Sequence, residues 1–195
     1  MPFLGRSAKR RILAPEDIPD DPERPGTVLV YRSRRGSALQ YARWIVEELD
    51  CDVMPFSRRW LGHVILYRTV VFLSWARAGE IVGLGLLRAC AERFLLPTKE
   101  LWVVAVGASG PTPGVMARLR ERNLSGGIAH ASLWTLPGRH APGKDRLLKW
   151  AYGRGMYDGL GPTDAAVLRE RLAEGFDGVD RSALAPLLQA LRPAP

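Results

Sequence analysis

The chain has 195 residues, of which 47% are hydrophobic, enough to bury the core of one ordinary domain and too many for a chain that is disordered throughout. Its 28 lysines and arginines exceed its 20 aspartates and glutamates, so the net charge of +8 favours anionic partners such as phosphates, anionic lipid, nucleic acid or an acidic protein. Cys51 and Cys90 are too few for a disulfide framework, and no apolar run is long enough to span a bilayer, so we expect a cytoplasmic protein.

The first 26 residues are rich in proline and charge and have no apolar periodicity. We therefore expect residues 1–26 to form a disordered tail and residues 27–193 to form one domain. Five basic and five acidic residues cancel within the tail, so the excess positive charge belongs to the domain.

From Thr27 onward, short apolar runs rich in β-branched residues alternate with segments whose apolar residues recur every three or four positions. This pattern is typical of strands that alternate with amphipathic helices. In chain order, the expected strands are 27–31, 51–54, 68–74, 101–106 and 128–136. The expected helices are 38–49, 81–94, 115–122, 145–152, 162–174, with Thr163 as its N-cap, and 183–191.

Alternating strands and helices build a parallel sheet with right-handed crossovers. The five apolar strands favour a flavodoxin-like α/β fold, a five-stranded parallel sheet of order 2-1-3-4-5 with helices on both faces. Ligands of such sheets bind at the carboxyl ends of the strands, near the switch between the first and third strands. The loops 32–37, 74–80 and 107–114 are therefore candidate binding loops.

The first of these loops, Ser33–Ala38, runs from a strand directly into a helix. Free backbone N–H groups at a helix start suit a phosphate, Gly36 permits close approach, and the neighbouring serines and arginines add donors and charge. The alternative is an ordinary capping box made by Ser37 and Gln40, which needs no ligand. Spacing does not decide between the two interpretations.

The second and third loops carry an aromatic residue and small residues, respectively. Trp75, followed by Arg77, could stack on a flat ring, or the indole could pack on the domain surface. The third loop, Gly107–Gly114, has small residues that leave room for a ligand, although it also reads as a turn-rich connection.

The segment Gly138–Asp145 nearly matches a nucleotide P-loop, but Asp145 stands where serine or threonine must bind magnesium. An ATP site is therefore not expected. Basic and aromatic residues continue through 134–157, which makes this stretch a candidate docking face for an acidic protein or the inner face of an anionic membrane; the alternative is a solvated basic face. The three histidines lack the spacing of a metal site, and no DNA-recognition helix or RNA-binding motif supports a nucleic-acid partner.

Several ordered motifs resemble the bacterial flavodoxin-domain family, whose relatives include flavodoxin and the menaquinone-dependent protoporphyrinogen oxidase of flavodoxin type. The resemblance covers roughly residues 27–193. The motifs are Tyr31-x-Ser33-x-x-Gly36-x-x-x-x-Tyr41-Ala42-x-Trp44-Ile45, then Tyr67–Phe72 continuing to Arg77–Gly83, then Val106–Ser109, and finally Gly175–Asp180 with Pro186–Leu188.

The resemblance implies FMN as the cofactor and an electron-transfer or oxidoreductase role, with a quinone or a porphyrinogen-like molecule as substrate. It assigns the phosphate to the first loop and the flavin ring to the other two, and it assigns no catalytic residue. The implied cofactor-binding residues are Ser33, Arg34, Arg35, Gly36, Ser37, Ala38, Ser74, Trp75, Ala76, Arg77, Gly107, Ala108, Ser109 and Gly110.

Three positions depart from the family pattern. Arg35 and Ala38 stand where the flavodoxin loop has hydroxyl side chains, and Leu73 stands where the third strand often ends in glycine, so we expect Leu73 to crowd the ring. These departures favour the alternative, a divergent fold that has lost FMN and serves as a binding or regulatory module for an anionic partner or surface.

Overall fold

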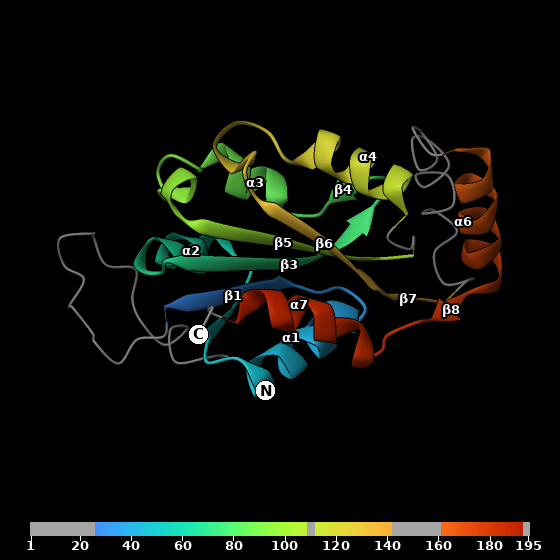
Figure 1. Cartoon of the computed structure of the whole chain (residues 1–195), viewed down its shortest axis with the longest axis horizontal. Helices are drawn as coiled ribbons and strands as arrows, with labels where there is room; N and C mark the ends of the chain where they lie inside the picture. The colour runs from blue at the N-terminus through green and yellow to red at the C-terminus, as the bar shows by residue number, and fades with distance from the viewer. Residues whose placement is uncertain (1–25, 109–111, 142–160, 193–195) are drawn as a thin grey trace.

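The computed structural model describes residues 26–108, 112–141 and 161–192. Five strands pair in parallel, and the sheet that they form runs through the centre of the fold (Figure 1). Their order across the sheet is β2-β1-β3-β5-β6. The order confirms the predicted flavodoxin-like topology, because these are the five expected strands taken in sequence as 2-1-3-4-5. The strands are β1 (Thr27–Arg32), β2 (Asp52–Pro55), β3 (Thr69–Arg77), β5 (Glu100–Gly107) and β6 (Ser132–Pro137).

Apolar residues lie in register across the middle of the sheet. Val30 of β1 is paired with Met54 of β2 on one side and with Phe72 of β3 on the other. Phe72 is in turn paired with Val103 of β5. These residues are 1% exposed or less, because helices cover both faces of a doubly wound sheet.

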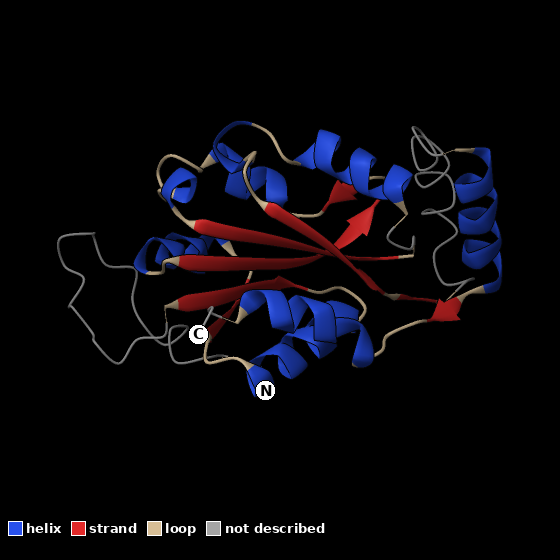
Figure 2. Ribbon diagram, in the orientation of Figure 1, coloured by secondary structure: helices blue, strands red, loops and turns tan. Residues whose placement is uncertain are grey.

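Two helices cover one face, α1 (Ser37–Glu48) and α7 (Ala185–Leu191), which lie side by side (Figure 2). Tyr41 and Ile45 of α1 share a buried cluster with Leu187 of α7. The Tyr41 hydroxyl also donates a hydrogen bond of 2.7 Å to the carbonyl of Pro137 at the end of β6. The short 3-10 turn η6 (Ser182–Leu184) leads into α7.

The opposite face is covered by α2 (Arg58–Leu61), α3 (Leu84–Ala89) and α4 (Pro113–Asn123). Leu61, Leu87 and Leu119 anchor these three helices in a second buried cluster. Further 3-10 turns connect the elements at η3 (Gly62–Leu66), η4 (Leu96–Thr98) and η5 (Gly126–Ile128).

Several predicted boundaries were wrong. The helix expected over 81–94 is α3 alone, because residues 80–81 form β4 (Glu80–Ile81), which pairs antiparallel with β3. The strand expected over 128–136 begins at Ser132, after the turn η5. Helix α6 (Pro162–Glu174) has Gly161 as its N-cap and no side-chain cap, so Thr163 is already inside the helix. The predicted helix 145–152 and tail residues 1–25 lie outside the described residues.

One helix and a small sheet lie beyond the carboxyl ends of the strands. Figure 1 shows α6 past that edge and not on a face of the main sheet. Strands β7 (Arg139–His140) and β8 (Phe176–Asp177) pair antiparallel beside it. These elements cover the edge at which an α/β sheet of this order binds ligands. In the described parts of the chain, we find no helix with the length and apolarity needed to cross a bilayer.

Cys51 immediately precedes β2 and is flanked in the chain by Asp50 and Asp52. Burial, together with the negative charges of Asp52 and Asp50, raises its pKa to about 12. Because the thiolate is the nucleophile, we expect Cys51 to resist a disulfide reagent at any pH well below that value in the folded protein and to react readily after denaturation. The reaction is followed by the absorbance of the thiolate that a coloured disulfide reagent releases. In a Cys90→Ser variant, this absorbance reports on Cys51 alone. Rapid reaction of the folded variant would contradict the expectation.

Candidate functional site

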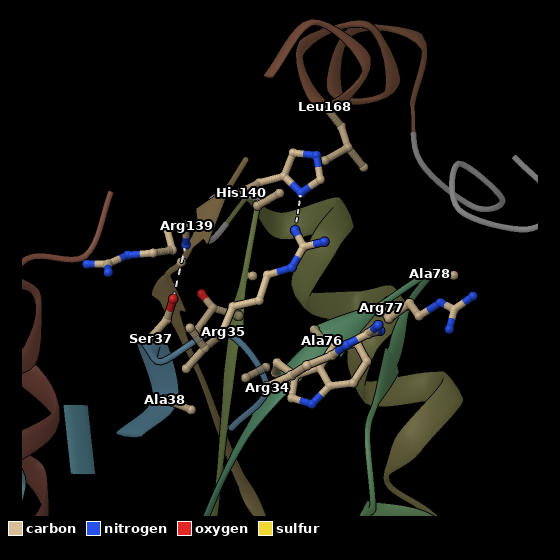
Figure 3. Close-up of a pocket in the computed structure, with 18 of the residues that line it drawn as sticks. Arg34, Arg35, Ser37, Ala38, Ala76, Arg77, Ala78, Arg139, His140 and Leu168 are labelled. Carbon is tan, nitrogen blue, oxygen red and sulfur yellow. Dashed lines mark hydrogen bonds between the residues drawn. The ribbon is translucent and has the colours of Figure 1, made fainter. Parts of the chain in front are cut away.

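A half-open pocket of about 150 Å³ lies at the carboxyl ends of β1, β3, β5 and β6 (Figure 3). A cavity of that size holds a benzene-sized group, so a larger ligand must extend through the open side. The wall combines the loop after β1, the β3–β4 hairpin, the end of β5, residues of α4, the strand β7 and the inner side of α6.

The loop between β1 and α1 presents backbone donors without a capping side chain. Gly36 is the N-cap of α1 with φ +89°, a left-handed conformation that favours glycine. No side chain caps the helix, so the predicted capping box of Ser37 and Gln40 is wrong. Ser37 is instead the first helical residue, and its hydroxyl accepts a hydrogen bond of 3.3 Å from the backbone N–H of Arg139 in β7. The first-turn N–H groups of α1 therefore have no side-chain acceptor from a cap.

Two hydroxyls in the pocket wall are buried without a hydrogen-bond partner among the described residues. They belong to Ser33 in the first loop and Thr135 in β6. A buried hydroxyl with no partner costs about 1–3 kcal/mol, so such groups are rare in native proteins. A ligand with polar atoms in this pocket would provide the missing partners.

Arg35 and His140 join the first loop to β7 across the pocket. The Arg35 guanidinium donates a hydrogen bond of 2.8 Å to Nδ1 of His140, as the dashed line in Figure 3 marks. Because arginine is always protonated, Nδ1 of His140 carries no proton in this contact. The His140 ring is stacked on Phe176 of β8, with 6.1 Å between the ring centroids. These contacts therefore connect the first loop to the small β7–β8 sheet.

Trp75, near the end of β3, forms the flat part of the wall. The guanidinium of Arg34 in the first loop lies over its indole at 6.0 Å from the ring centroid, a cation–π contact. Arg77 extends from the same strand on the side of the pocket away from His140. The indole thus offers an aromatic face that is at present covered by arginine.

Helix α4 fixes the tip of the β3–β4 hairpin. The Asn123 side chain accepts a hydrogen bond of 2.8 Å from the N–H of Ile81 and donates one of 2.7 Å to the carbonyl of Gly79. One turn and a half earlier, Arg118 lies across Gly79, where a Cβ atom would be only 2.8 Å from Nε of Arg118. The missing side chain at Gly79 allows this close approach.

Helix α6 forms the roof of the pocket through Leu168 and Leu172. Its first turn is held to α4, because the Thr112 hydroxyl donates a hydrogen bond of 3.0 Å to a carboxylate oxygen of Asp164. At its other end, the guanidinium of Arg171 lies 4.7 Å from the centroid of Phe176. The roof is therefore attached at both ends of the helix.

The pocket is strongly cationic. Five arginines line it, with His140 and no aspartate or glutamate among the described lining residues: Arg34, Arg35, Arg77, Arg118 and Arg139. Arg139 has a partner in Asp177 of β8 at 3.1 Å, an ion pair that is largely exposed. A wall of this composition favours an anionic ligand.

Most of the predicted cofactor-binding residues meet in this one pocket. Gly36 and Ser74 do not line it: the Ser74 hydroxyl donates to the Val82 carbonyl at 2.6 Å, and Gly36 is the N-cap of α1. Ser109 and Gly110 lie outside the described residues. The predicted residues that line the pocket are Ser33, Arg34, Arg35, Ser37, Ala38, Trp75, Ala76, Arg77, Gly107 and Ala108.

Two other expectations concern Leu73 and the candidate docking face. Leu73 does not line the pocket, because its side chain is fully buried in the cluster under α1 and α7, so the prediction that it crowds a ring there was wrong. Of the candidate docking face, Trp134 packs on Trp102 with 6.3 Å between centroids, whereas Arg139 and His140 line the pocket. Residues 142–157 of that face lie outside the described residues.

The sequence analysis assigned no residue of β6, β7, α4 or α6 to the cofactor site, although it singled out the stretch 134–157 as a candidate docking face. Gly138, Arg139 and His140 follow the fifth strand, so the rule that singled out the other loops would have found them. Arg118, Leu168 and Leu172 carried no comparable signal, because their contribution depends on where α4 and α6 pack. Among the described residues, no group of three or more histidine, cysteine, aspartate or glutamate side chains could hold a metal ion.

Similar solved structures include the Trp repressor binding protein of Bacillus subtilis, which is 13% identical with a TM-score of 0.46 and matches over 69% of this chain and 99% of its own. A flavodoxin, WrbA-like protein of Agrobacterium tumefaciens is 14% identical with a TM-score of 0.42, over 74% of this chain and 97% of its own. A flavodoxin from the domain Archaea is 16% identical with a TM-score of 0.36, over 73% and 98%, respectively. No family model and no curated protein matches the chain.

Proposed function

We propose that the protein binds FMN in this pocket and has an electron-transfer or oxidoreductase role. The observation that carries the proposal is the buried hydroxyl of Ser33, which lines the pocket with no hydrogen-bond partner among the residues that the structure describes, beside a helix start that none of their side chains caps. A phosphate group is the ligand that such a set of donors fits, since it accepts hydrogen bonds from hydroxyls, from helix N-terminal N–H groups and from arginine.

Different residues would bind the two ends of the cofactor. Ser33, the first-turn N–H groups of α1 and the Arg35 guanidinium would hold the phosphate. Trp75 would hold the flat ring, which takes the place of the Arg34 guanidinium now lying over the indole. When bound, the flavin supplies the capacity to accept and donate electrons. The surrounding arginines favour its more negative, reduced form and so raise its reduction potential.

Purification without added cofactor followed by a visible spectrum is the first test. The apo protein is then titrated with FMN while flavin fluorescence is followed. A bound flavin band, or saturable quenching at micromolar or lower FMN, supports the proposal. A colourless protein that never saturates would overturn it and would favour the alternative below.

The alternative is a flavin-free module that binds an anionic partner or surface. The specific observation in its favour is the hydrogen bond of Arg35 to His140. Arg35 stands where the flavodoxin loop has a hydroxyl side chain, and here its guanidinium contacts the protein itself. The partner would be an acidic protein or the anionic inner face of a membrane. Vesicles of anionic lipid that bind the apo protein with steep salt dependence, in the absence of any flavin binding, would support it.

For the flavoprotein, the substrate or redox partner is a further part of the proposal. A quinone or a porphyrinogen-like molecule is proposed by resemblance. The quinone is tested by reducing the flavin of the holoprotein with an electron donor and then adding a quinone. Recovery of the visible band of oxidised flavin would support a quinone as electron acceptor. The rate should fall with added salt if an anionic partner docks on the basic face.

A further inference from the structure

The proposed function leaves one buried hydroxyl of the pocket wall, that of Thr135 in β6, without a role. Its Oγ1 atom is shielded from solvent and has no hydrogen-bond partner among the residues that the structure describes. Unpartnered buried hydroxyls are rare in native proteins, because burying a hydroxyl without a hydrogen bond is costly. A hydroxyl of this kind in a pocket wall indicates a ligand that provides the missing hydrogen bond.

The side chain of Thr135 lies on the face of the sheet that α4 covers. Of its two neighbours in β6, Leu136 belongs to the buried cluster under α1 and α7, and Trp134 packs against that cluster. Leu133, two residues before Thr135, belongs to the cluster on the opposite face, under α4. Because side chains alternate between the two faces along a strand, Thr135 shares the face of Leu133.

The pocket-lining residues around Thr135 on this face have apolar side chains. Thr135 is paired in register with Ala105 of β5, whose side chain is a methyl group. Ala105 belongs to the same buried cluster as Val115 and Leu119 of α4, and all three line the pocket. These side chains have no polar atom that could bind the hydroxyl, which agrees with its lack of a partner in the described structure.

The strand register places Thr135 in the same row as the end of β1. Ala105, its partner in β5, is also paired with Ser74 of β3, and Ser74 is paired with Arg32 of β1. The next residue after Arg32 is Ser33, whose hydroxyl is proposed to hold the phosphate. Neighbouring strands are about 4.8 Å apart, so three spacings separate the two unpartnered hydroxyls by roughly 14 Å across the sheet.

Trp75 belongs to a strand that lies between these two hydroxyls, because β3 and β5 separate β1 from β6. A ligand that is held at the first loop and on the indole, and that also reaches Thr135, extends over two more strand spacings, roughly 10 Å. A fused ring system has that length, whereas a single six-membered ring does not.

We infer that Thr135 is a specificity-determining residue of the pocket, whose hydroxyl binds the polar edge of a fused heterocycle that carries carbonyl and N–H groups. The inference rests on the proposed function, because the flavin ring is a heterocycle of this class. A hydroxyl can donate to a carbonyl or accept from an N–H, so it fits either group. A hydrocarbon ring of the same size would leave the hydroxyl unpartnered and should bind more weakly.

Fluorescence titration with FMN, and with lumiflavin, which has the same ring system but no phosphate, tests the inference on the full chain. Thr135→Val removes the hydroxyl and nearly keeps the shape. We expect it to weaken the binding of both ligands about tenfold, the loss typical of a buried polar group left without its partner. Thr135→Ser keeps a hydroxyl and should restore most of both affinities. Ser33→Ala should weaken FMN alone, because lumiflavin has no phosphate.

Thr69→Val is the matched control. Thr69 is a buried strand residue that does not line the pocket, and its hydroxyl already donates a hydrogen bond of 2.9 Å to Glu100. This change should lower the denaturant midpoint of the apo protein and leave both affinities unchanged. Thr135→Val should show the opposite pattern, with a midpoint that stays constant or rises and with both ligands bound more weakly.

The outcomes separate this inference from the proposed function. If the native chain binds FMN and Thr135→Val binds it equally well, the inference is overturned and the cofactor is supported. A lower midpoint in Thr135→Val would also overturn the inference, since it would mean that the hydroxyl has a partner within the protein. Lumiflavin binding that depends on Thr135, with FMN bound no more tightly, would support the ring contact and overturn the phosphate assignment. A native chain that binds neither ligand would overturn both proposals.

Discussion

Replacing Gly36 by valine is expected to abolish retention of FMN. Gly36 has φ +89°, and a β-branched residue at a positive φ costs about 1–3 kcal/mol. A Cβ atom there would meet nothing within 4 Å, so the loss comes from the backbone conformation and not from a clash. The loop would relax toward negative φ and move the first-turn N–H groups of α1, and a displacement of about 1 Å in such a site weakens function about a hundredfold.

Gly126→Val is the matched control for this change. Gly126 has φ +58°, and a Cβ atom there also meets nothing within 4 Å, but the residue begins the turn η5 and does not line the pocket. Both variants should lose a similar amount of unfolding free energy in a denaturant titration. Only Gly36→Val should lose the flavin band; equal FMN affinity in the two variants would remove the first loop from the site.

The sheet could be predicted from the sequence because each strand carries its own signal. Runs such as Val70–Leu73 and Leu101–Val106 are buried on both faces, so nearly every residue in them is apolar. The position of the first loop followed from the same pattern, since a strand, a glycine and an amphipathic helix occur there in immediate succession. Local signals were sufficient for these features.

The roof of the pocket could not be predicted in this way. Helix α6 was expected with nearly its observed bounds, yet nothing in its residues indicates that it lies beyond the sheet edge and not on a face. Its attachment depends on contacts between distant residues, such as that of Thr112 with Asp164. The α1 cap was also misread, because the Ser37 hydroxyl has a partner in β7, about a hundred positions away.

The positive charge of the pocket could be predicted only in part from the sequence. Net charge alone indicated an anionic partner, but it did not place the charge. In the structure, the arginines come from three separate parts of the chain, the first loop, the β3–β4 hairpin with α4, and β7. This distribution suits an anionic ligand that is contacted by several elements at once.

Ser33→Ala should weaken FMN binding about tenfold or more while leaving the protein at least as stable. The hydroxyl is buried in the pocket wall with no partner in the described structure, so removing it relieves a polar group that is unsatisfied in the apo protein. The unfolding free energy should therefore stay constant or rise by about 1 kcal/mol. The holoprotein, in contrast, loses a hydrogen bond to a charged phosphate, which is typically worth about 1.5–3 kcal/mol.

Ser57→Ala makes this prediction specific to the pocket. Ser57 also has a buried hydroxyl with no partner in the described ranges, but it precedes α2 and does not line the pocket. The two alanine variants should behave alike in a denaturant titration of the apo protein and differ only in the FMN titration. Because a purely structural role would change stability and affinity together, an unchanged FMN affinity in Ser33→Ala, or a stability loss without the affinity loss, would mean that this hydroxyl has no phosphate to bind.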